Sequence, residues 1–265
     1  MPGKIRVGIG GWTFEPWRDN FFPAKWPKAR ELEYASGQVT AIEINGTFYS
    51  TQKPATWSDW AKRTPEDFVF AVKASRFCTN RRVLAEAGES IAKFVNQGLS
   101  ELGPKLGPIL WQFAATKKFE PDDFGAFLKL LPASVAGVPL RHAIEPRHES
   151  FRDPALVAMA RAAGAAIVFA DGAERPQFAD LTAPFAYARL QDADEAIATG
   201  YDAAALDRWA ETARGWAAGD APAGYEYIVP AKSDGIARDT FVFMINGAKV
   251  RAPAAAMALI ERVGR

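Results

Sequence analysis

The chain has 265 residues, 49% of them hydrophobic, and its 32 Lys and Arg residues balance 31 Asp and Glu residues to a formal net charge of +1. This length and composition indicate one domain, residues 1–265, with one large hydrophobic core. The near-zero net charge supplies no global field that would hold a polyanion or a membrane surface, so any recognition of an anion must be local.

The cysteine and histidine content limits the disulfides and metal sites that the protein can have. The single Cys78 excludes an internal disulfide framework, and the first residues lack the apolar segment of a signal peptide. No apolar run approaches the roughly 20 residues that cross a bilayer, so we expect a soluble, cytoplasmic protein without a membrane partner. With only His142 and His148 present, a multi-histidine or Cys/His metal centre is excluded. A carboxylate-rich magnesium site is left open, but we expect neither a metal nor a cofactor.

Eight apolar runs of strand type follow one another along the chain, and polar or aromatic residues follow the runs. The second begins the segment 41–49, and the others occupy residues 7–10, 68–72, 109–111, 140–144, 165–170, 186–188 and 241–245. Helical patterns fall between them, at residues 29–36, 55–63, 90–102, 122–131, 153–162, 203–216 and 253–263. Between residues 171 and 185 the pattern is short and interrupted by proline, so we expect an incomplete sixth helix.

This alternation predicts an α/β fold, a TIM-type (β/α)8 barrel whose strand ends gather on one rim. The alternative is an open doubly wound sheet. Against this alternative, the chain lacks the glycine-rich phosphate turn of a dinucleotide-binding sheet, because Gly8-Ile9-Gly10-Gly11 leads into Trp12 and not into a helix.

Three residues are catalytic candidates. Glu43 and Glu145 end the second and fifth runs, so in a closed barrel they would face one cavity and could divide acid and base work. Alternatively, each neutralises a neighbouring cation in a polar barrel core. His148 lies in the loop after Glu145, where an imidazole could transfer protons near neutral pH.

Three cations end or follow other runs and indicate an anionic ligand. Arg147 and Arg189 can bind phosphate, sulfate or carboxylate through a bidentate fork, and Lys73 acts as a point charge. The competing interpretation pairs Lys73 with Glu43, and Arg147 or Arg189 with Glu145, which leaves little free charge.

Amides and aromatic rings complete the predicted ligand-binding set. Asn45, Gln112 and Asn246 stand at strand ends and could orient a polar ligand, although amides also commonly satisfy loop backbone groups. Trp12 and Tyr49 could stack on a sugar or a base, or could simply pack.

Ordered motifs along nearly the whole chain resemble the YecE-like family, catalogued as domain of unknown function 72. The matching motifs are Gly11-Trp12-Thr13-Phe14 with Trp17 and Phe22-Pro23, Glu43-Ile44-Asn45-Gly46-Thr47-Phe48-Tyr49, Phe70 with Lys73, Leu110-Trp111-Gln112-Phe113, Glu145-Pro146-Arg147-His148-Glu149-Ser150-Phe151, Tyr187-Ala188-Arg189-Leu190, and Asn246 ahead of Ala252-Pro253. The resemblance implies a TIM-type barrel with a shared pocket and no settled activity.

The chain also departs from the pattern of that family. Asn80 follows Thr79 where relatives usually have histidine, and Gln191-Asp192 stands where they have His-Gly. Where an Asn-Asn pair is usual, the last strand ends Ile245-Asn246. Two imidazoles are thus replaced, so either the chemistry of the family does not need them or this member has altered it.

These observations favour an enzyme, of hydrolase or isomerase type, that acts on a small anionic or polyhydroxylated substrate. The alternative is a non-catalytic protein that binds nucleic acid or another phosphate-bearing ligand, which the near-zero net charge disfavours. A divalent-metal hydrolase is third, because histidines are sparse. Hydropathy singles out no outer helix for pairing with a second subunit.

Overall fold

A computed structural model describes residues 1–172, 176–245 and 247–264. Nine short strands form one sheet in the order β8-β7-β4-β3-β2-β1-β11-β10-β9, and every pair in it is parallel. The strands are β1 (Ile5–Gly10), β2 (Ala41–Ile44), β3 (Val69–Lys73), β4 (Leu106–Gln112), β7 (His142–Glu145), β8 (Ala166–Ile167), β9 (Phe169–Ala170), β10 (Phe185–Leu190) and β11 (Asp239–Met244).

The sheet curls into a nearly closed barrel through its sixth run. The predicted strand over residues 165–170 is divided at Val168 into β8, which pairs with β7, and β9, which pairs with β10. The two edges of the sheet are therefore neighbours in the chain. Eight strand positions result, one for each predicted run, and the TIM-type barrel predicted from the sequence is confirmed.

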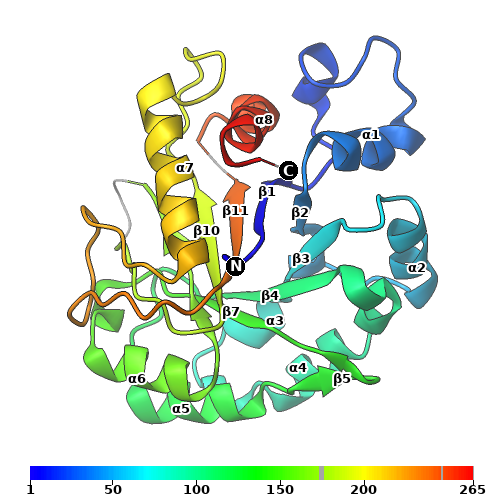
Figure 1. Ribbon diagram of the computed structural model, residues 1–265. Coiled ribbons are helices and arrows are strands. Elements are labelled where there is room, and N and C mark those ends of the chain that lie inside the picture. Colours follow the sequence, from blue (N-terminus) through cyan, green and yellow to red (C-terminus); the bar gives the residue numbers. More distant parts are fainter. Residues whose placement is uncertain (173–175, 246, 265) are drawn as a thin grey trace.

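The helices form an outer ring around the strands (Figure 1). They are α1 (Glu31–Gln38), α2 (Pro54–Lys62), α3 (Arg76–Thr79), α4 (Gly88–Val95), α5 (Pro121–Leu130), α6 (Pro154–Ala162), α7 (Ala203–Ala218) and α8 (Ala252–Val263). The proline-interrupted pattern between β9 and β10 predicted an incomplete helix, and the described residues there contain no helix. In the part of the chain that the structure describes, no helix combines the length and the apolar character needed to span a bilayer.

One predicted helix is wrong. The pattern over residues 90–102 predicted a continuous helix, but α4 ends at Val95 and a separate 3-10 helix, Leu99–Lys105, follows. Gly98 between them has a φ of 115°, which residues with a side chain rarely adopt. A Cβ on Gly98 would also lie 2.8 Å from Cα of Pro54, so the break lets α2 pack closely. A small unpredicted hairpin, β5 (Ser134–Val135) and β6 (Val138–Pro139), precedes β7.

Proline and aspartate stand at the starts of several helices. Asp153 accepts a hydrogen bond from the amide of Ala155 at 2.8 Å and precedes Pro154, the first residue of α6. Asp202 accepts from the amide of Ala205 at 2.7 Å and begins α7. Each of these helices packs its apolar stripe on the outside of the barrel, in the larger of two buried clusters.

The second buried cluster fills the barrel interior, and the side chains in its two halves differ in size. In this cluster the residues of β10 and β11 are aromatic, whereas β2, β7 and β8 contribute alanine and β3 contributes both alanine and Val69. The aromatic set is Phe185, Tyr187, Phe241 and Phe243, and the alanine set is Ala41, Ala71, Ala143 and Ala166. On β1, a Cβ on Gly8 would lie 2.0 Å from the carbonyl oxygen of Ala41 and 3.1 Å from the Phe243 ring, so no side chain fits there. The rings of β10 and β11 thus take up the space that alanine and glycine leave.

Candidate functional site

Arg189 joins the two glutamates that the sequence placed at the rim. Its Nε donates to Oε2 of Glu43 at 3.0 Å, its Nη2 donates to Oε1 of Glu43 at 3.0 Å, and its Nη1 donates to Oε2 of Glu145 at 2.8 Å. Only 2% of Arg189 and none of either glutamate is exposed. We call Arg189, Glu43 and Glu145 the ion cluster. One guanidinium bridges both carboxylates, so neither pairing of single residues predicted from the sequence describes the arrangement fully.

The strand pleat explains why these three side chains meet. Glu43, Glu145 and Arg189 each stand two positions after an interior residue of their own strand, and successive residues of a strand alternate between its faces. All three therefore point into the barrel, near the carboxyl ends of β2, β7 and β10. Parallel strands bring these ends to one rim.

Two neutral side chains also donate hydrogen bonds to the ion cluster. Gln112, opposite Glu145 in the register of β4 and β7, donates from Nε2 to Oε2 of Glu145 at 2.9 Å. The hydroxyl of Tyr187 donates to Oε2 of Glu43 at 2.7 Å. Tyr187 was not among the predicted site residues. The signal for it was its position two residues before Arg189, on the same face of β10.

The ion cluster keeps Glu43 ionised. Burial alone would raise the pKa of Glu43, but the charge of Arg189, its hydrogen bonds, the Tyr187 hydroxyl and the more distant Lys73 together lower it. For Arg189, burial would lower the pKa, but Glu145 and Glu43 raise it well above its usual value. Two carboxylates face one guanidinium here, and Lys73 and Arg147 are further cations within electrostatic reach.

Lys73 is the last residue of β3 and lies half-buried near the ion cluster. Burial and the positive charge of Arg189 lower its pKa to about 8, although Glu43 and Glu145 oppose this shift. The ammonium nitrogen lies 4.3 Å from the centroid of the Phe48 ring, a cation–π contact, and it makes no hydrogen bond to any residue that the structure describes. The Thr47 hydroxyl fixes the Phe48 turn by donating to the carbonyl of Lys73 at 2.6 Å.

The predicted ligand-binding residues that follow β1 and β2 have different surroundings. Asn45 donates from Nδ2 to the main-chain carbonyl of Glu43 at 3.2 Å, so its amide supports the loop. Tyr49 is 70% exposed on the rim, edge-on to the Phe48 ring. Trp12 instead contacts the ring of Trp60 on α2, with centroids 5.1 Å apart, and therefore packs against the outer core.

Arg147 and His148 both lie half-buried in the loop after β7. The charge of Arg147 contributes to the lowered pKa of Lys73, which places the two cations within electrostatic reach of each other. The Nδ1 atom of His148 accepts a hydrogen bond from the amide of Ser150 at 3.1 Å and caps a short 3-10 helix, so the cap engages Nδ1 and not Nε2. Asn246 lies outside the described residues.

A further buried carboxylate follows β9. Asp171 is 6% exposed, accepts a hydrogen bond from the amide of Gln191 and another from the Tyr201 hydroxyl at 3.3 Å, and has a pKa that burial raises to about 6. Its position directly after the sixth run was the signal for it. Among the described residues, no three His, Cys, Asp or Glu side chains gather in a way that could hold a metal ion.

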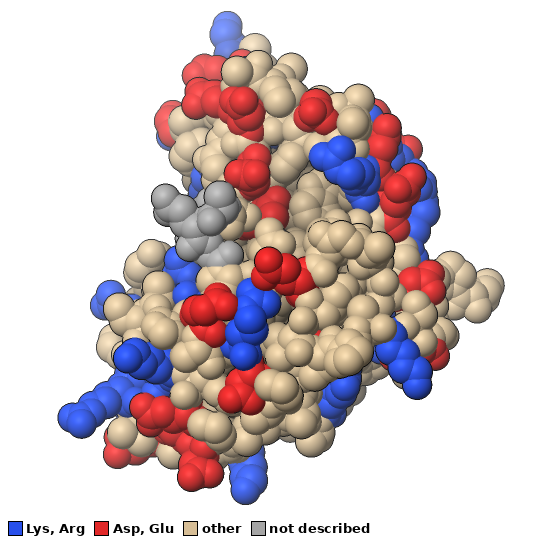
Figure 2. Space-filling model, turned by 90° about the vertical axis from the view of Figure 1, so that its left-hand side faces the viewer, with Lys and Arg blue, Asp and Glu red and all other residues tan. Residues whose placement is uncertain are grey.

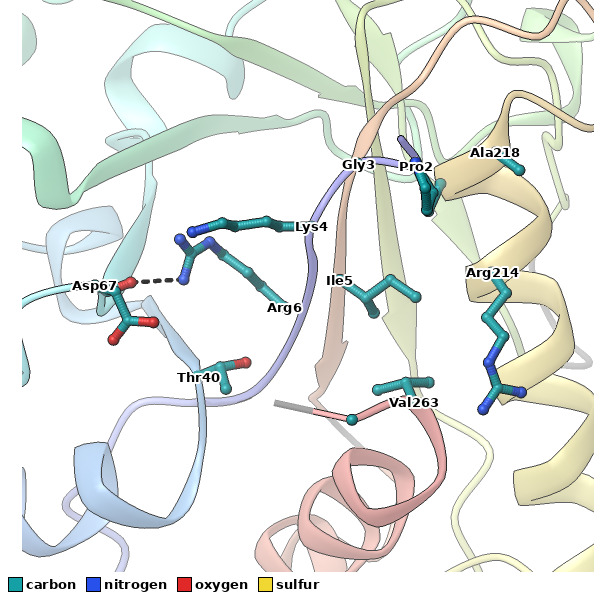
Figure 3. Close-up of a pocket in the computed structure, with 12 residues that line it drawn as sticks. Pro2, Gly3, Lys4, Ile5, Arg6, Thr40, Asp67, Arg214, Ala218 and Val263 are labelled. Atoms are coloured by element: carbon teal, nitrogen blue, oxygen red, sulfur yellow. Dashed lines mark hydrogen bonds between the residues drawn. The ribbon is translucent and has the colours of Figure 1, made fainter.

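A pocket of about 550 Å³ opens at the opposite end of the barrel, around the first residues of β1 (Figure 3). There Arg6 donates to the main-chain carbonyl of Asp67 at 2.6 Å, and Arg214 of α7 lines the other side. Active sites of TIM barrels lie at the carboxyl ends of the strands, whereas this pocket lies at their amino ends. We therefore place the candidate site at the ion cluster and Lys73.

Comparison with solved structures confirms the fold. A DUF72 family protein from Thermotoga maritima MSB8 superposes with a TM-score of 0.72 at 19% sequence identity, covering 97% of this chain and 98% of that one. A DUF72 family protein from Enterococcus faecalis V583 gives 0.70 at 17% identity, with 98% and 95% covered. A structure described as SacUVDE gives 0.54 at 10% identity and covers 98% of each chain.

Comparison of sequences gives the family. The UPF0759 protein YunF of Bacillus subtilis (strain 168) is 26% identical over 155 residues, which are 57% of this chain and 53% of YunF. The match thus spans about half the length of that relative. The family model described as "Protein of unknown function DUF72" matches residues 6–265. Since that match extends over nearly the entire sequence, the chain belongs to the DUF72 family of proteins of unknown function.

Proposed function

We propose that the protein is an enzyme that acts on a small anionic or polyhydroxylated substrate at the carboxyl ends of its barrel strands. The observation that carries this proposal is Lys73, an amine at the rim with a pKa of about 8, set beside buried carboxylates. Such a group can donate or accept a proton near neutral pH, and perturbed pKa values gather at functional sites.

The depth of each side chain suggests a division of roles. Lys73 and Arg147 are partly exposed, so the anionic part of a substrate would meet them first. Both carboxylates of the ion cluster are fully covered. Glu43, whose pKa is lowered, supplies fixed negative charge and not a proton. Glu145 is the acid–base candidate within the ion cluster, and His148 could relay a proton through Nε2.

This arrangement suits hydrolase or isomerase chemistry. In an isomerase, the neutral amine of Lys73 would remove a proton next to a carbonyl group, and the charge of Arg147 would stabilise the negative charge that develops. In a hydrolase, the same amine would activate a water molecule. Both schemes require Lys73 to change its protonation state during turnover.

A ligand screen tests the proposal. Wild-type protein, Lys73→Met and the control Lys93→Met, which removes an exposed lysine of α4, would be screened by thermal shift against sugars, hydroxy acids and sugar phosphates. Compounds that stabilise the wild type and the control but not Lys73→Met would then be followed by NMR for conversion. A compound that is converted equally well by Lys73→Met would remove Lys73 from the mechanism.

Binding of nucleic acid is the alternative function, and it has less support. On the face that Figure 2 shows, basic and acidic side chains are interspersed and form no continuous basic track. The net charge of +1 agrees with that distribution. Nonspecific binding of a polyanion depends steeply on salt, so an oligonucleotide titration at low and moderate salt separates the two functions.

A further inference from the structure

A second pocket, of about 520 Å³, lies between the loops that follow β3 and β4. Its walls come from two adjacent strands of the sheet, so they stand side by side at the same rim as the ion cluster. It is lined by Thr79, Asn80, Arg81, Arg82, Ala114, Thr116, Lys117, Lys118 and Glu120. We propose that this pocket, which we call the basic pocket, binds the phosphate group of a small phosphomonoester.

The balance of charge in the basic pocket favours an anion. Four of its side chains are cationic, and one, Glu120, is acidic. Only Lys117 of the four forms an ion pair with a described residue, at 2.7 Å from Asp123 of α5. Arg81 donates to the main-chain carbonyl of Glu86 at 2.6 Å, a bond that leaves its charge unneutralised. When both carboxylates are counted against the four cations, two positive charges remain, which matches a phosphate dianion.

The walls of the basic pocket are joined before any ligand arrives. Asp123 accepts from the amide of Ala85 at 2.9 Å and from Nζ of Lys117 at 2.7 Å. Lys117 also donates to the carbonyl of Arg82 at 2.8 Å. The side chains of Lys117 and Asp123 are only 10% and 12% exposed, so these bonds are shielded from water. A site fixed in this way needs little ordering when it binds, which favours affinity.

The cations of the basic pocket are of two kinds. Arg81 and Arg82 supply the planar donors that match phosphate geometry, and Lys118 supplies a point charge.

The lining also indicates which phosphate compound binds. Single-stranded nucleic acid is held by aromatic rings on which its bases stack, and the residues that line the basic pocket include no such ring. A compact phosphomonoester needs only the charged and hydroxyl groups that are present. This assignment does not depend on an acid–base role for Lys73.

Calorimetric titration with glycerol 3-phosphate, inorganic phosphate, glycerol and a short single-stranded oligonucleotide tests the assignment. The test variant is Arg82→Gln/Lys118→Gln, which changes two exposed cations of the pocket, and the matched control is Lys93→Gln/Lys129→Gln, which removes the same charge elsewhere. We expect glycerol 3-phosphate to bind the wild type and the control alike, and the test variant about tenfold or more weakly, since two charge-assisted contacts are lost. Glycerol should not bind.

The assignment is overturned if glycerol 3-phosphate fails to bind the wild type, if the control variant loses as much affinity, or if the oligonucleotide binds more tightly through the same two cations. Every substitution lies outside the ion cluster and Lys73, so these outcomes leave the proposed enzymatic function to its own test.

Discussion

Arg189 and Glu43 are joined by two hydrogen bonds of 3.0 Å, although they lie 146 positions apart in the chain. The remaining nitrogen of the same guanidinium, Nη1, donates to Glu145. A single side chain of β10 thus ties β2 and β7 together through the middle of the barrel. Both carboxylates depend on that one cation for direct pairing within the ion cluster, so removing it should cost more than removing a surface ion pair.

Replacing Arg189 with methionine should destabilise the protein by about 3 to 5 kcal/mol, because it leaves buried carboxylates without their counter-charge. The measurement is urea unfolding followed by circular dichroism. As a control, Arg189→Met combined with Glu43→Gln and Glu145→Gln should recover much of the lost stability, since no buried charge is then left unpaired. A loss below about 1 kcal/mol for the single variant would show that water or another group compensates the carboxylates.

Replacing Tyr187 with phenylalanine should cost about 1.5 to 3 kcal/mol of unfolding free energy, the range for a hydrogen bond to a charged group. The ring stays in place in the barrel interior, so the loss reports on the hydroxyl that donates to Glu43. Tyr49→Phe is the matched control, because Tyr49 is 70% exposed. Equal stability of the two variants would contradict a role for the Tyr187 hydroxyl in holding Glu43.

The amine of Lys73 should titrate with a pKa of about 8. NMR of reductively methylated protein measures it, and Lys73→Met assigns the resonance. In Glu43→Gln the pKa should fall further, because the negative charge of Glu43 raises it in the native protein. Titration of Lys73 near the usual value for lysine, about 10.4, would rule out the proposed proton transfer at neutral pH.

Asp171 should make stability depend on pH between about 4 and 6. Its pKa in the folded protein is about 6, against an ordinary value of 3.8, so the folded state binds more protons in that interval. Its contribution to stability is complete below pH 3.8 and is lost as the pH rises through 6. The wild type should therefore gain stability relative to Asp171→Asn as the pH falls from 6 to 4, as measured by urea unfolding at each pH. A constant difference between the two proteins would mean that Asp171 is already ionised throughout this range.

Much of the site could be predicted from the sequence because strand ends in a barrel share one rim. Glu43, Glu145 and Arg189 were all placed there by the position of each at the end of an apolar run. Orientation within a strand has a period of two, so the run also indicates which residues point inward. Tyr187 follows from the same rule, but a tyrosine within an apolar run looks like any other core residue.

The partners of each side chain were beyond sequence reasoning. Trp12 and Tyr49 both follow strand ends, yet one packs against Trp60 and the other lies on the surface. His148 follows Arg147 in a predicted loop, but its Nδ1 caps a 3-10 helix. The helical pattern did not reveal the break at Gly98, because the apolar periodicity continues across this residue although its φ is positive.

The sequence by itself therefore determined the kind of fold, the rim and the set of ionisable groups, because these depend on the order of apolar runs and on what ends each run. Only the tertiary structure decided that Arg189 bridges both glutamates and that Lys73 lies beside them without a hydrogen bond to a described residue. It alone also showed the basic pocket between the loops after β3 and β4. Hydrogen bonds and pKa values depend on distances of a few ångströms between residues far apart in the chain, and barrel closure sets those distances.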